Sequence, residues 1–390
     1  MSSTLGRSAP STSSLPPAKR QKKRSSTLSS SAPPLGKFLA SSDKSTRDKA
    51  VASLSRFLSA GRLNHLGPLA AAQAGDEDLQ DDAEEEELPV GDLNWDDEYE
   101  VDSRLAPLEM AKLWKGIYYC YWMSDKPLVQ QALAQNLADL TLDVRPRSKT
   151  RNGRVERFRS ALAFLRGFWE AIVREWSTLD HHRLDKFLLL IRRFTHVGFR
   201  LLEREQWDAR AIDEYNAMLT GPGGPLDVTN DKVPISLAYH LFDIYLDEIE
   251  RLVTPSDQDA ASESDRSLPL LPLLGPMYTT AARAPLQIMF TRLVDNVFTP
   301  LLDALLPPKP EPRAKRRRGA AGRAKDPAYP GIRASAVEGT GVEDPSAAAE
   351  VVGKQVLKRL FEEGGQEETG ETQRRRIYTF VTARDVDFEE

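Results

Sequence analysis

An all-α protein, built from helix pairs stacked like HEAT repeats into an α-solenoid, is the fold class that this sequence predicts. Apolar residues recur every three or four positions in successive segments of about 15–25 residues, which is the period of an amphipathic helix. No stretch shows the sustained polar–apolar alternation of a half-buried strand. Short turns between consecutive amphipathic helices favour stacked pairs, and the absence of a fixed sequence period means that the expected repeats are degenerate.

The helical body is predicted to occupy residues 35–305, and three other segments differ from it in composition. Residues 1–34 are rich in Ser, Pro and Lys/Arg and are expected to form a disordered basic tail. An insertion at 61–103 contains fifteen Asp/Glu and no base between residues 76 and 102, so we expect it to be disordered as well. Residues 306–390 are predicted to be a mostly disordered tail with one short helix near 347–362.

The first part of the body is predicted to hold three helices. Asp43 is a suitable cap for a helix that runs to about Ser59. The apolar face of the next helix consists of Leu105, Leu108, Leu113, Trp114, Ile117, Tyr118, Tyr121 and Trp122. Since proline fits the first turn of a helix, Pro127 is expected to begin the third. Its apolar positions are Leu128, Leu133, Leu137 and Leu140.

Five further helical patterns complete the predicted body. They cover about 155–176, 180–201, 207–219, 235–252 and 286–301. The loop 221–225 is glycine-rich, but it lacks the Gly-Lys-Ser/Thr ending with which a P-loop holds phosphates, so we interpret it as a turn.

Cysteine usage and hydropathy narrow the class of protein. Cys120 is the only cysteine, so an intramolecular disulfide and a thiolate zinc cluster are both excluded, and its apolar neighbours predict a buried thiol. The polar N-terminal sequence lacks the apolar core of a secretory signal. No apolar run approaches the roughly 20 residues that cross a bilayer. We therefore expect a soluble protein of a reducing compartment, with no membrane partner.

The motifs of catalysis and metal binding are missing from the sequence. His181 and His182 are adjacent, so on a helix they point about 100° apart and cannot hold one metal ion from the same face. There is no Gly-x-Ser-x-Gly elbow, and paired carboxylates are abundant only in the acidic insertion. The prediction is a protein that is not an enzyme, without catalytic, metal or cofactor-binding residues and without a small-molecule substrate.

A basic connection before the helix at 155–176 is the best structured candidate for contact with RNA. Seven positive charges fall within fifteen residues: Arg145, Arg147, Lys149, Arg151, Arg154, Arg157 and Arg159. Clustered cations bind phosphates by releasing counterions, although an ordinary solvated surface explains the same pattern equally well. Arg192 and Arg193 could extend this patch or could serve in packing and ion pairs. The Trp and Tyr residues at 114–122 follow helical spacing and are expected in the core.

Two short basic clusters are candidate nuclear-import signals. The first consists of Lys19, Arg20, Lys22, Lys23 and Arg24, and the second of Lys315, Arg316, Arg317 and Arg318. Dense basic runs of this kind are typical of import signals, while the alternative is a solvated basic tail.

Several segments resemble one known family. The run 112–127, Lys-Leu-Trp-Lys-Gly-Ile-Tyr-Tyr-Cys-Tyr-Trp-Met-Ser-Asp-Lys-Pro, resembles the signature segment of the ribosomal RNA-processing protein 1 family. Leu-Gly-Lys-Phe-Leu-Ala at 35–40, with Asp43 and Thr-Arg-Asp-Lys-Ala at 46–50, is similar to the N-terminal helix pair of that family. Residues 184–194, Leu-Asp-Lys-Phe-Leu-Leu-Leu-Ile-Arg-Arg-Phe, are similar to its Asp-Lys-aromatic helix. The resemblance covers about 35–305, and the acidic insertion departs from it.

The resemblance implies a HEAT-like body without enzymatic activity that resides in the nucleolus. It implies work on precursors of the large ribosomal subunit, together with other assembly factors and ribosomal proteins, in processing the spacers of pre-rRNA. We therefore expect a scaffold of the pre-large-subunit particle that contacts pre-rRNA directly or through partners. The alternatives are a helical-repeat adaptor of nuclear transport or signalling and, third, a nuclease, which would need an acidic metal site inside the body.

Overall fold

The computed structural model describes residues 35–59, 107–146, 153–254, 267–306, 328–337 and 340–384. Within these ranges every regular element is a helix and none is a strand, so the predicted all-α class is confirmed. The predicted N-terminal tail 1–34 and the acidic insertion 61–103 lie outside the described residues.

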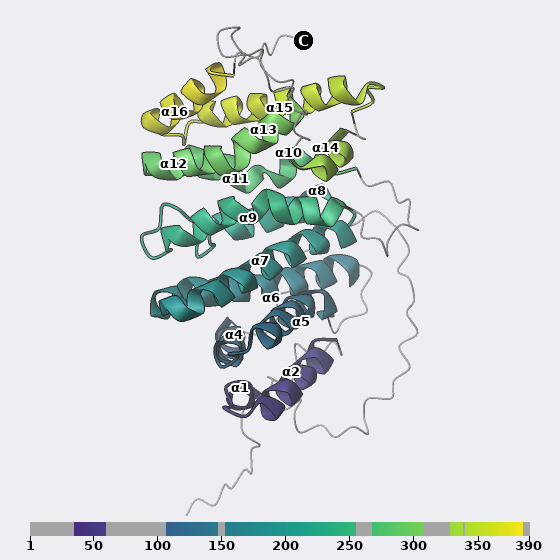
Figure 1. Ribbon diagram of the computed structural model, residues 1–390, viewed down its shortest axis with the longest axis vertical. Coiled ribbons are helices and arrows are strands. Elements are labelled where there is room, and N and C mark those ends of the chain that lie inside the picture. The colour runs from purple at the N-terminus through teal and green to yellow at the C-terminus, as the bar shows by residue number, and fades with distance from the viewer. Residues whose placement is uncertain are drawn as a thin grey trace, which may run out of the picture.

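The described helices form a stack that runs from the purple end of Figure 1 to its yellow end. The first half contains α1 (Leu35–Leu39), α2 (Lys44–Ser59), α4 (Pro107–Trp122), α5 (Pro127–Asp143), α6 (Gly153–Glu175) and α7 (His181–Arg204). The second half contains α8 (Ala209–Thr220), α9 (Ile235–Val253), α10 (Leu270–Leu273), α11 (Gly275–Arg283), α12 (Gln287–Leu293), the π-helix η4 (Val294–Phe298) and α13 (Thr299–Leu305). The chain then adds α14 (Pro330–Val337), α15 (Pro345–Gly365) and α16 (Glu371–Thr382).

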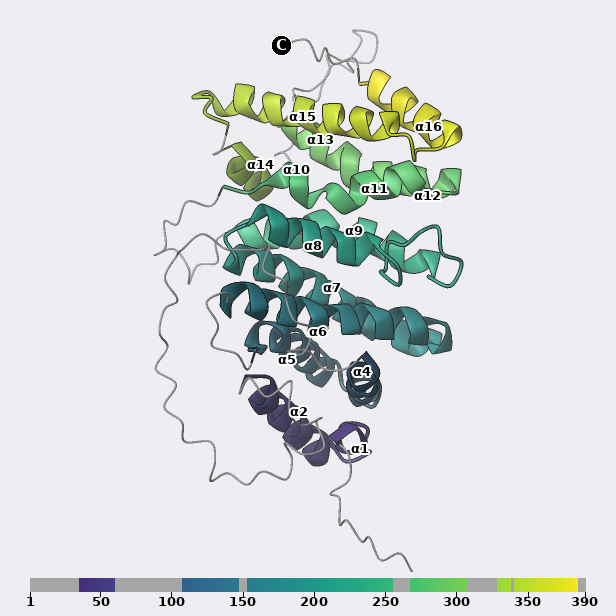
Figure 2. The same cartoon turned by 180° about the vertical axis from the view of Figure 1, so that it is seen from behind.

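Consecutive helices pair, and the pairs stack in two layers. One layer places α4 against α1, α6 against α4, α8 against α6 and α11 against α8; Figure 2 is seen from this side. The other layer places α5 against α2, α7 against α5, α9 against α7 and α12 against α9; it faces the viewer in Figure 1. Each pair therefore contacts the next, as in a solenoid. The stack has two rims: the turns within pairs lie on one, and the connections between pairs form the other, which we call the inter-pair rim.

Several predicted helix ends are confirmed by their caps. The Asp43 carboxylate accepts a hydrogen bond from the backbone N–H of Thr46 at 2.7 Å, and Asp180 accepts one from Arg183 at 3.0 Å, so both satisfy a free donor of the first turn. Pro127 begins α5. In contrast, Leu108, Leu128 and Leu286 were expected on apolar faces and are 66%, 79% and 47% exposed. Each lies at a helix start, where a side chain projects past the neighbouring helices.

The long helix predicted at 286–301 is interrupted by a π-helical turn. It divides into α12, η4 and α13, and Pro300 stands just after η4. Proline has no N–H to donate and its ring crowds the preceding turn, so the backbone cannot keep the α-helical bond there. A wider π turn accommodates the proline while Val297, Phe298 and Leu301 stay buried.

The structure corrects the prediction of a mostly disordered tail after residue 305. The expected helix near 347–362 is present as α15, but it is longer, and α14 and α16 also pack on the same core. Small residues conceal this packing in the sequence, because α15 buries Ala348, Ala349 and Gly353. A Cβ atom on Gly353 would lie 2.7 Å from the side chain of Leu306, so only glycine allows that approach. The remaining residues of the segment, 307–327, 338–339 and 385–390, are outside the described ranges.

Polar contacts hold the C-terminal helices as well. The Glu250 carboxylate of α9 accepts hydrogen bonds from the backbone N–H groups of Gly331 and Ile332, each at 2.8 Å, and so caps α14. The side chains of Gln373 and Arg376 on α16 both donate to the carbonyl of Ala284 at 3.2 Å. The folded body therefore extends to residue 384.

The aromatic residues of α4 are core residues, as predicted. Trp114, Tyr118 and Tyr121 are at most 4% exposed. Cys120 is 1% exposed, and burial raises the pKa of its thiol to about 11, so the thiol stays protonated near neutral pH. Its chemistry is that of a small apolar side chain.

A buried lysine closes the C-terminal end of α4. The Lys186 ammonium group on α7 donates to the carbonyl oxygens of Tyr121 at 3.2 Å, Trp122 at 2.7 Å and Ser124 at 2.8 Å. These carbonyls have no partner within the helix, and the positive charge also suits the negative end of the helix dipole. Burial lowers the pKa of Lys186 to about 8.

The N-terminal helix pair reaches the same turn. The Arg47 guanidinium of α2 donates to the carbonyls of Ser41 and Ser42 at 2.8 and 2.9 Å and to that of Met123 at 3.4 Å. The three segments that carry the family resemblance, at 35–50, 112–127 and 184–194, therefore meet at the end of α4.

We expect Lys186→Met to lower the free energy of unfolding by about 2–3 kcal/mol, because the variant keeps the volume but leaves buried carbonyls without a donor. Chemical denaturation measures this loss. Lys115→Met is the matched control, since Lys115 is exposed on α4, and its stability should stay within about 0.5 kcal/mol of the parent. Equal stability of the two variants would contradict the role of Lys186.

Candidate nucleic-acid interface

Two of the predicted RNA-contact residues lie on the inter-pair rim. Arg145 follows α5 and is exposed, while Arg154 is in the first turn of α6. The backbone N–H of Arg145 donates to the carbonyl of Leu58 at 3.0 Å, which places the end of α2 beside it. Arg147, Lys149 and Arg151 lie outside the described residues. The import candidates Lys19, Arg20, Lys22, Lys23, Arg24 and Lys315, Arg316, Arg317, Arg318 lie outside them too.

Two arginines share one buried carboxylate at this rim. Glu205, at the end of α7, is 3% exposed and accepts from Arg154 Nε at 2.8 Å and from Arg204 Nε at 2.9 Å. Arg204 also donates to the carbonyl of Leu142 on α5 at 3.2 Å. Burial lowers the pKa of Arg204, and the charges of Arg154 and Arg145 lower it further against the attraction of Glu205. The cluster of Arg145, Arg154, Arg204 and Glu205 therefore carries a net positive charge.

The turn after Glu205 has an unusual backbone. Gln206 and Trp207 have φ angles of 55° and 57°, although neither is glycine. Each such residue costs of the order of 1–3 kcal/mol, so the surrounding contacts must hold the turn. The N–H groups of Gln206 and Trp207 donate to the carbonyls of Glu203 and Leu202 at 2.8 and 3.0 Å, and Asp208 caps α8 through the N–H of Arg210. The result is a rigid turn between α7 and α8.

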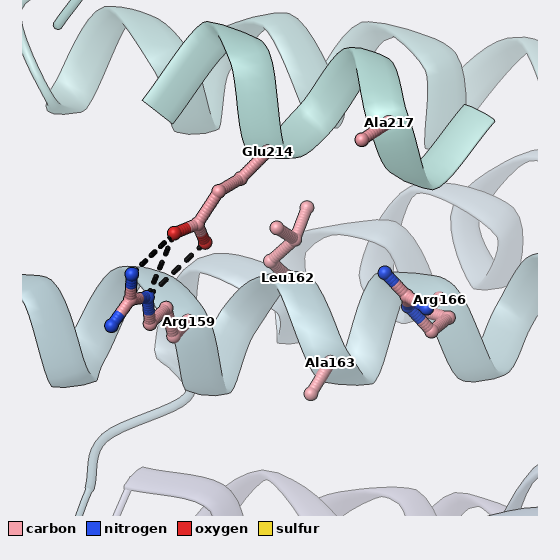
Figure 3. A pocket seen from close by; sticks show the side chains of 6 residues that line it. All are labelled: Arg159, Leu162, Ala163, Arg166, Glu214 and Ala217. Atoms are coloured by element: carbon pink, nitrogen blue, oxygen red, sulfur yellow. Dashed lines mark hydrogen bonds and ion pairs between the residues drawn. The ribbon is translucent and has the colours of Figure 1, made fainter. Parts of the chain in front are cut away.

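Arg159, the last cation of the basic run, is engaged in an ion pair between helices. Its Nε atom donates to both carboxylate oxygens of Glu214 on α8, at 2.9 and 3.2 Å. This pair stands at one side of a shallow groove of about 210 Å³ between α6 and α8, with Arg166 farther along α6 (Figure 3). Ala163 and Ala217 make the groove shallow and featureless, and it offers no nucleophile or base beside a substrate-sized space. Arg159 serves helix packing here.

Arg192 also has a structural role and does not extend the basic connection. It joins α7 to α9 through the Glu248 carboxylate and through Asp247 Oδ2 at 3.0 Å. Glu248 is fully buried, and His196 Nδ1 lies 3.2 Å from its other oxygen. The ion-pair alternative for Arg192 is thus the one the structure supports.

Sequence reasoning missed half of the cluster at the rim. Arg204 and Glu205 lie about fifty residues after Arg154, and nothing in either stretch reveals the pairing. The spacing of helices in a stack brings them together, so only the tertiary structure could identify them. Within the described ranges, no three His, Cys, Asp or Glu side chains are placed to hold a metal ion, and no helix there has the length and hydropathy to span a membrane.

The unresolved question of the basic connection has a direct test. We expect Arg147→Ala, Lys149→Ala and Arg151→Ala together to weaken binding to purified pre-rRNA and to reduce its salt dependence by about three phosphate contacts. The loss should be similar for unrelated RNA sequences, because phosphate contacts carry little sequence information. Titrations at several salt concentrations measure both, and circular dichroism should show unchanged helical content. Unchanged RNA binding with loss of a protein neighbour would identify a protein-docking surface instead.

Comparison with known proteins places these features in a family. The sequence pattern of the family described as "Nucleolar protein, Nop52" matches residues 93–361, which is more than half of the chain. This chain belongs to the Nop52 family. The match includes the helices α4 to α14 and most of α15, so the C-terminal helices that the sequence analysis left out of the body are inside it. The family's description as nucleolar agrees with the location expected for this chain.

Relatives of this Nop52-family chain carry the family name that the resemblance indicated. Ribosomal RNA processing protein 1 homolog A of Mus musculus is 28% identical over 203 residues, 51% of this chain and 36% of that protein. Homolog B of Homo sapiens is 32% identical over 151 residues, 37% of this chain and 17% of that protein. The homolog of Caenorhabditis elegans is 24% identical over 291 residues, 74% of this chain and 60% of that protein. The chain thus matches roughly a third or less of the length of its mammalian relatives named here, and the recognised family is confirmed.

Proposed function

We propose that this protein is a non-enzymatic nucleolar assembly factor of the large ribosomal subunit, required for processing the spacers of pre-rRNA. The match to the Nop52 family over residues 93–361, with relatives named for ribosomal RNA processing, carries this proposal. The chain acts as a scaffold on the pre-large-subunit particle, and its partners are pre-rRNA, other nucleolar assembly factors and ribosomal proteins.

The shape and the charges of the body support a scaffold. A stack of helix pairs offers long surfaces on both layers and both rims, as expected for a protein that positions several partners at once. Many charged side chains of the described helices are committed to neighbouring helices, as in the pairs Arg159–Glu214 and Arg200–Asp139. The body is thereby stiffened, while the strongest uniform charge lies in segments between and beside the helices.

Depletion of the protein tests the function. We expect spacer-containing precursors of the large-subunit rRNA to accumulate, and a tagged chain to co-sediment with large-subunit precursors in salt that releases loose contacts. A protein that sediments freely, with normal pre-rRNA processing after depletion, would contradict the proposal. That result would favour an adaptor of nuclear transport or signalling, the runner-up function.

The first basic cluster has a predicted role in delivery to the nucleus. Replacing Lys19, Arg20, Lys22, Lys23 and Arg24 with Ala should leave a fluorescently tagged chain partly cytoplasmic, because import receptors read dense positive charge. Replacing Lys315–Arg318 in the same way separates the contribution of the second cluster. Full nucleolar fluorescence in both variants would show that the chain enters with a partner.

A further inference from the structure

Trp207 differs from the other tryptophans in the described part of the chain. Trp114, Trp122 and Trp169 each contact another aromatic ring, and the indole N–H of Trp176 donates to Ser236 Oγ at 2.9 Å. Among the described residues, Trp207 has no aromatic neighbour, no cation over its ring and no hydrogen bond from its indole. It is only partly buried, with part of the ring packed against the core. One part of the indole is thus anchored and another part faces solvent.

The backbone fixes that ring in place. Trp207 follows Gln206 in the left-handed region, in a turn closed by the Leu202 carbonyl on one side and by the cap of α8 on the other. Bulky residues rarely adopt this conformation, and such strained positions concentrate at functional sites. A ring held this way loses little side-chain entropy when a ligand stacks on it.

Positive charge surrounds the same turn. Arg204 and Glu205 immediately precede Gln206, and the Arg154 side chain is held against Glu205 at 2.8 Å. Arg154 commits its Nε atom to Glu205, yet its side chain stays 25% exposed. Arg145 is exposed and close enough to act on Arg204. An aromatic platform beside arginines is the combination that recognises single-stranded nucleic acid, by stacking a base and holding the adjoining phosphates.

We propose that Trp207 stacks an unpaired base of RNA while Arg154 and Arg145 bind the flanking phosphates. Glu205 and Arg204 act as positioning residues, since they orient Arg154 and the turn. This inference rests on the proposed function, and it names the RNA class: a single-stranded stretch, as opposed to a duplex, whose bases are already stacked on one another. An acidic peptide could use the arginines but would gain nothing from the indole.

Titration of the full chain with fluorescein-labelled oligonucleotides tests the proposal. The probes are a 12-nucleotide oligouridine, a 12-base-pair RNA duplex and an oligoglutamate peptide of equal length. The parent should prefer oligouridine over both others, and its tryptophan fluorescence should fall on binding.

Substitutions at Trp207 should separate stacking from charge. Trp207→Ala should weaken oligouridine binding about tenfold, while the slope of log affinity against log salt stays unchanged because no charge is lost. Trp207→Phe should stay within about threefold of the parent. Trp207→Gly removes the ring and relieves the positive φ, so it reports the same loss even where the alanine variant folds poorly. Arg145→Ala should reduce the salt slope by about one.

Trp176→Ala is the matched control, because Trp176 is also partly exposed but lies at a turn within a pair, on the other rim. Its oligouridine affinity should equal that of the parent. Binding by Trp207→Ala and Trp207→Gly within twofold of the parent overturns the inference, as does equal parental affinity for the duplex or the peptide. Co-sedimentation of these variants with large-subunit precursors is scored separately. A parent that binds no oligouridine yet co-sediments refutes the inference and leaves the proposed function intact.

Discussion

Trp114→Ala is expected to lower the free energy of unfolding of the helical body by about 3–5 kcal/mol, the usual cost of truncating a buried aromatic residue. Trp114 is 2% exposed. Its ring centroid lies 4.6 Å from that of Phe164 and 5.6 Å from those of Phe168 and Phe194. The sequence predicted packing against the helices at 128–140 and 155–176; these ring contacts are made with α6 and, beyond the prediction, with α7.

Close packing leaves the cavity little room to collapse. A Cβ atom on Gly167 would lie 2.4 Å from the Trp114 ring, so α6 already approaches α4 as nearly as a glycine permits. Chemical denaturation followed by circular dichroism measures the loss, and Leu128→Ala, at a side chain that is 79% exposed, is the control. A Trp114→Ala variant as stable as its parent that no longer joins the precursor particle would show that Trp114 contacts a partner.

Arg192→Met should cost a comparable 3–5 kcal/mol, because it leaves the Glu248 carboxylate buried without its main counter-charge. Burial alone would raise the pKa of Glu248, but His196 and Arg192, through hydrogen bonds and charge, hold it below its ordinary value. Arg200→Met is the matched control on the same helix. Its partner Asp139 is 40% exposed, so the loss should stay below about 1 kcal/mol.

The pH dependence distinguishes the buried pair from simple packing. A carboxyl group whose pKa is lower in the folded chain stabilises it above the unfolded pKa of about 4.3, and this contribution is lost as the pH falls further. In Arg192→Met the carboxyl takes up a proton more readily, which relieves the buried charge. The stability difference between parent and variant should therefore shrink as the pH is lowered from 7 towards 4. A difference that is independent of pH would mean that only the packing of the Arg192 side chain was lost.

Helix positions were readable from the sequence where caps and large apolar residues coincide. Asp43, Asp180 and Pro127 mark helix starts through local chemistry, which short-range patterns capture. The helices α14 to α16 were underestimated because their buried faces rely on residues such as Ala348 and Gly353, which have little hydrophobic signal. Their packing depends on α9, α11 and α13, far away in the sequence.

The candidate interface was only partly readable for a similar reason. The basic run around Arg145 and Arg154 is a local pattern of charge and could be found. Its partners, Arg204 and Glu205, come from the next helix pair. The left-handed turn at Trp207 also has no sequence marker, since a Gln-Trp pair does not favour positive φ.

The polar contacts at the end of α4 have a consequence for how relatives of this protein can diverge. Lys186, Ser124 and Arg47 belong to three different helix pairs, yet they satisfy the carbonyls of a single turn. A change at one of these positions should be tolerated only with a compensating change at another, such as a shorter turn or a donor supplied from α2. We expect the corresponding columns to covary across Nop52-family sequences, although more than sixty residues separate each pair.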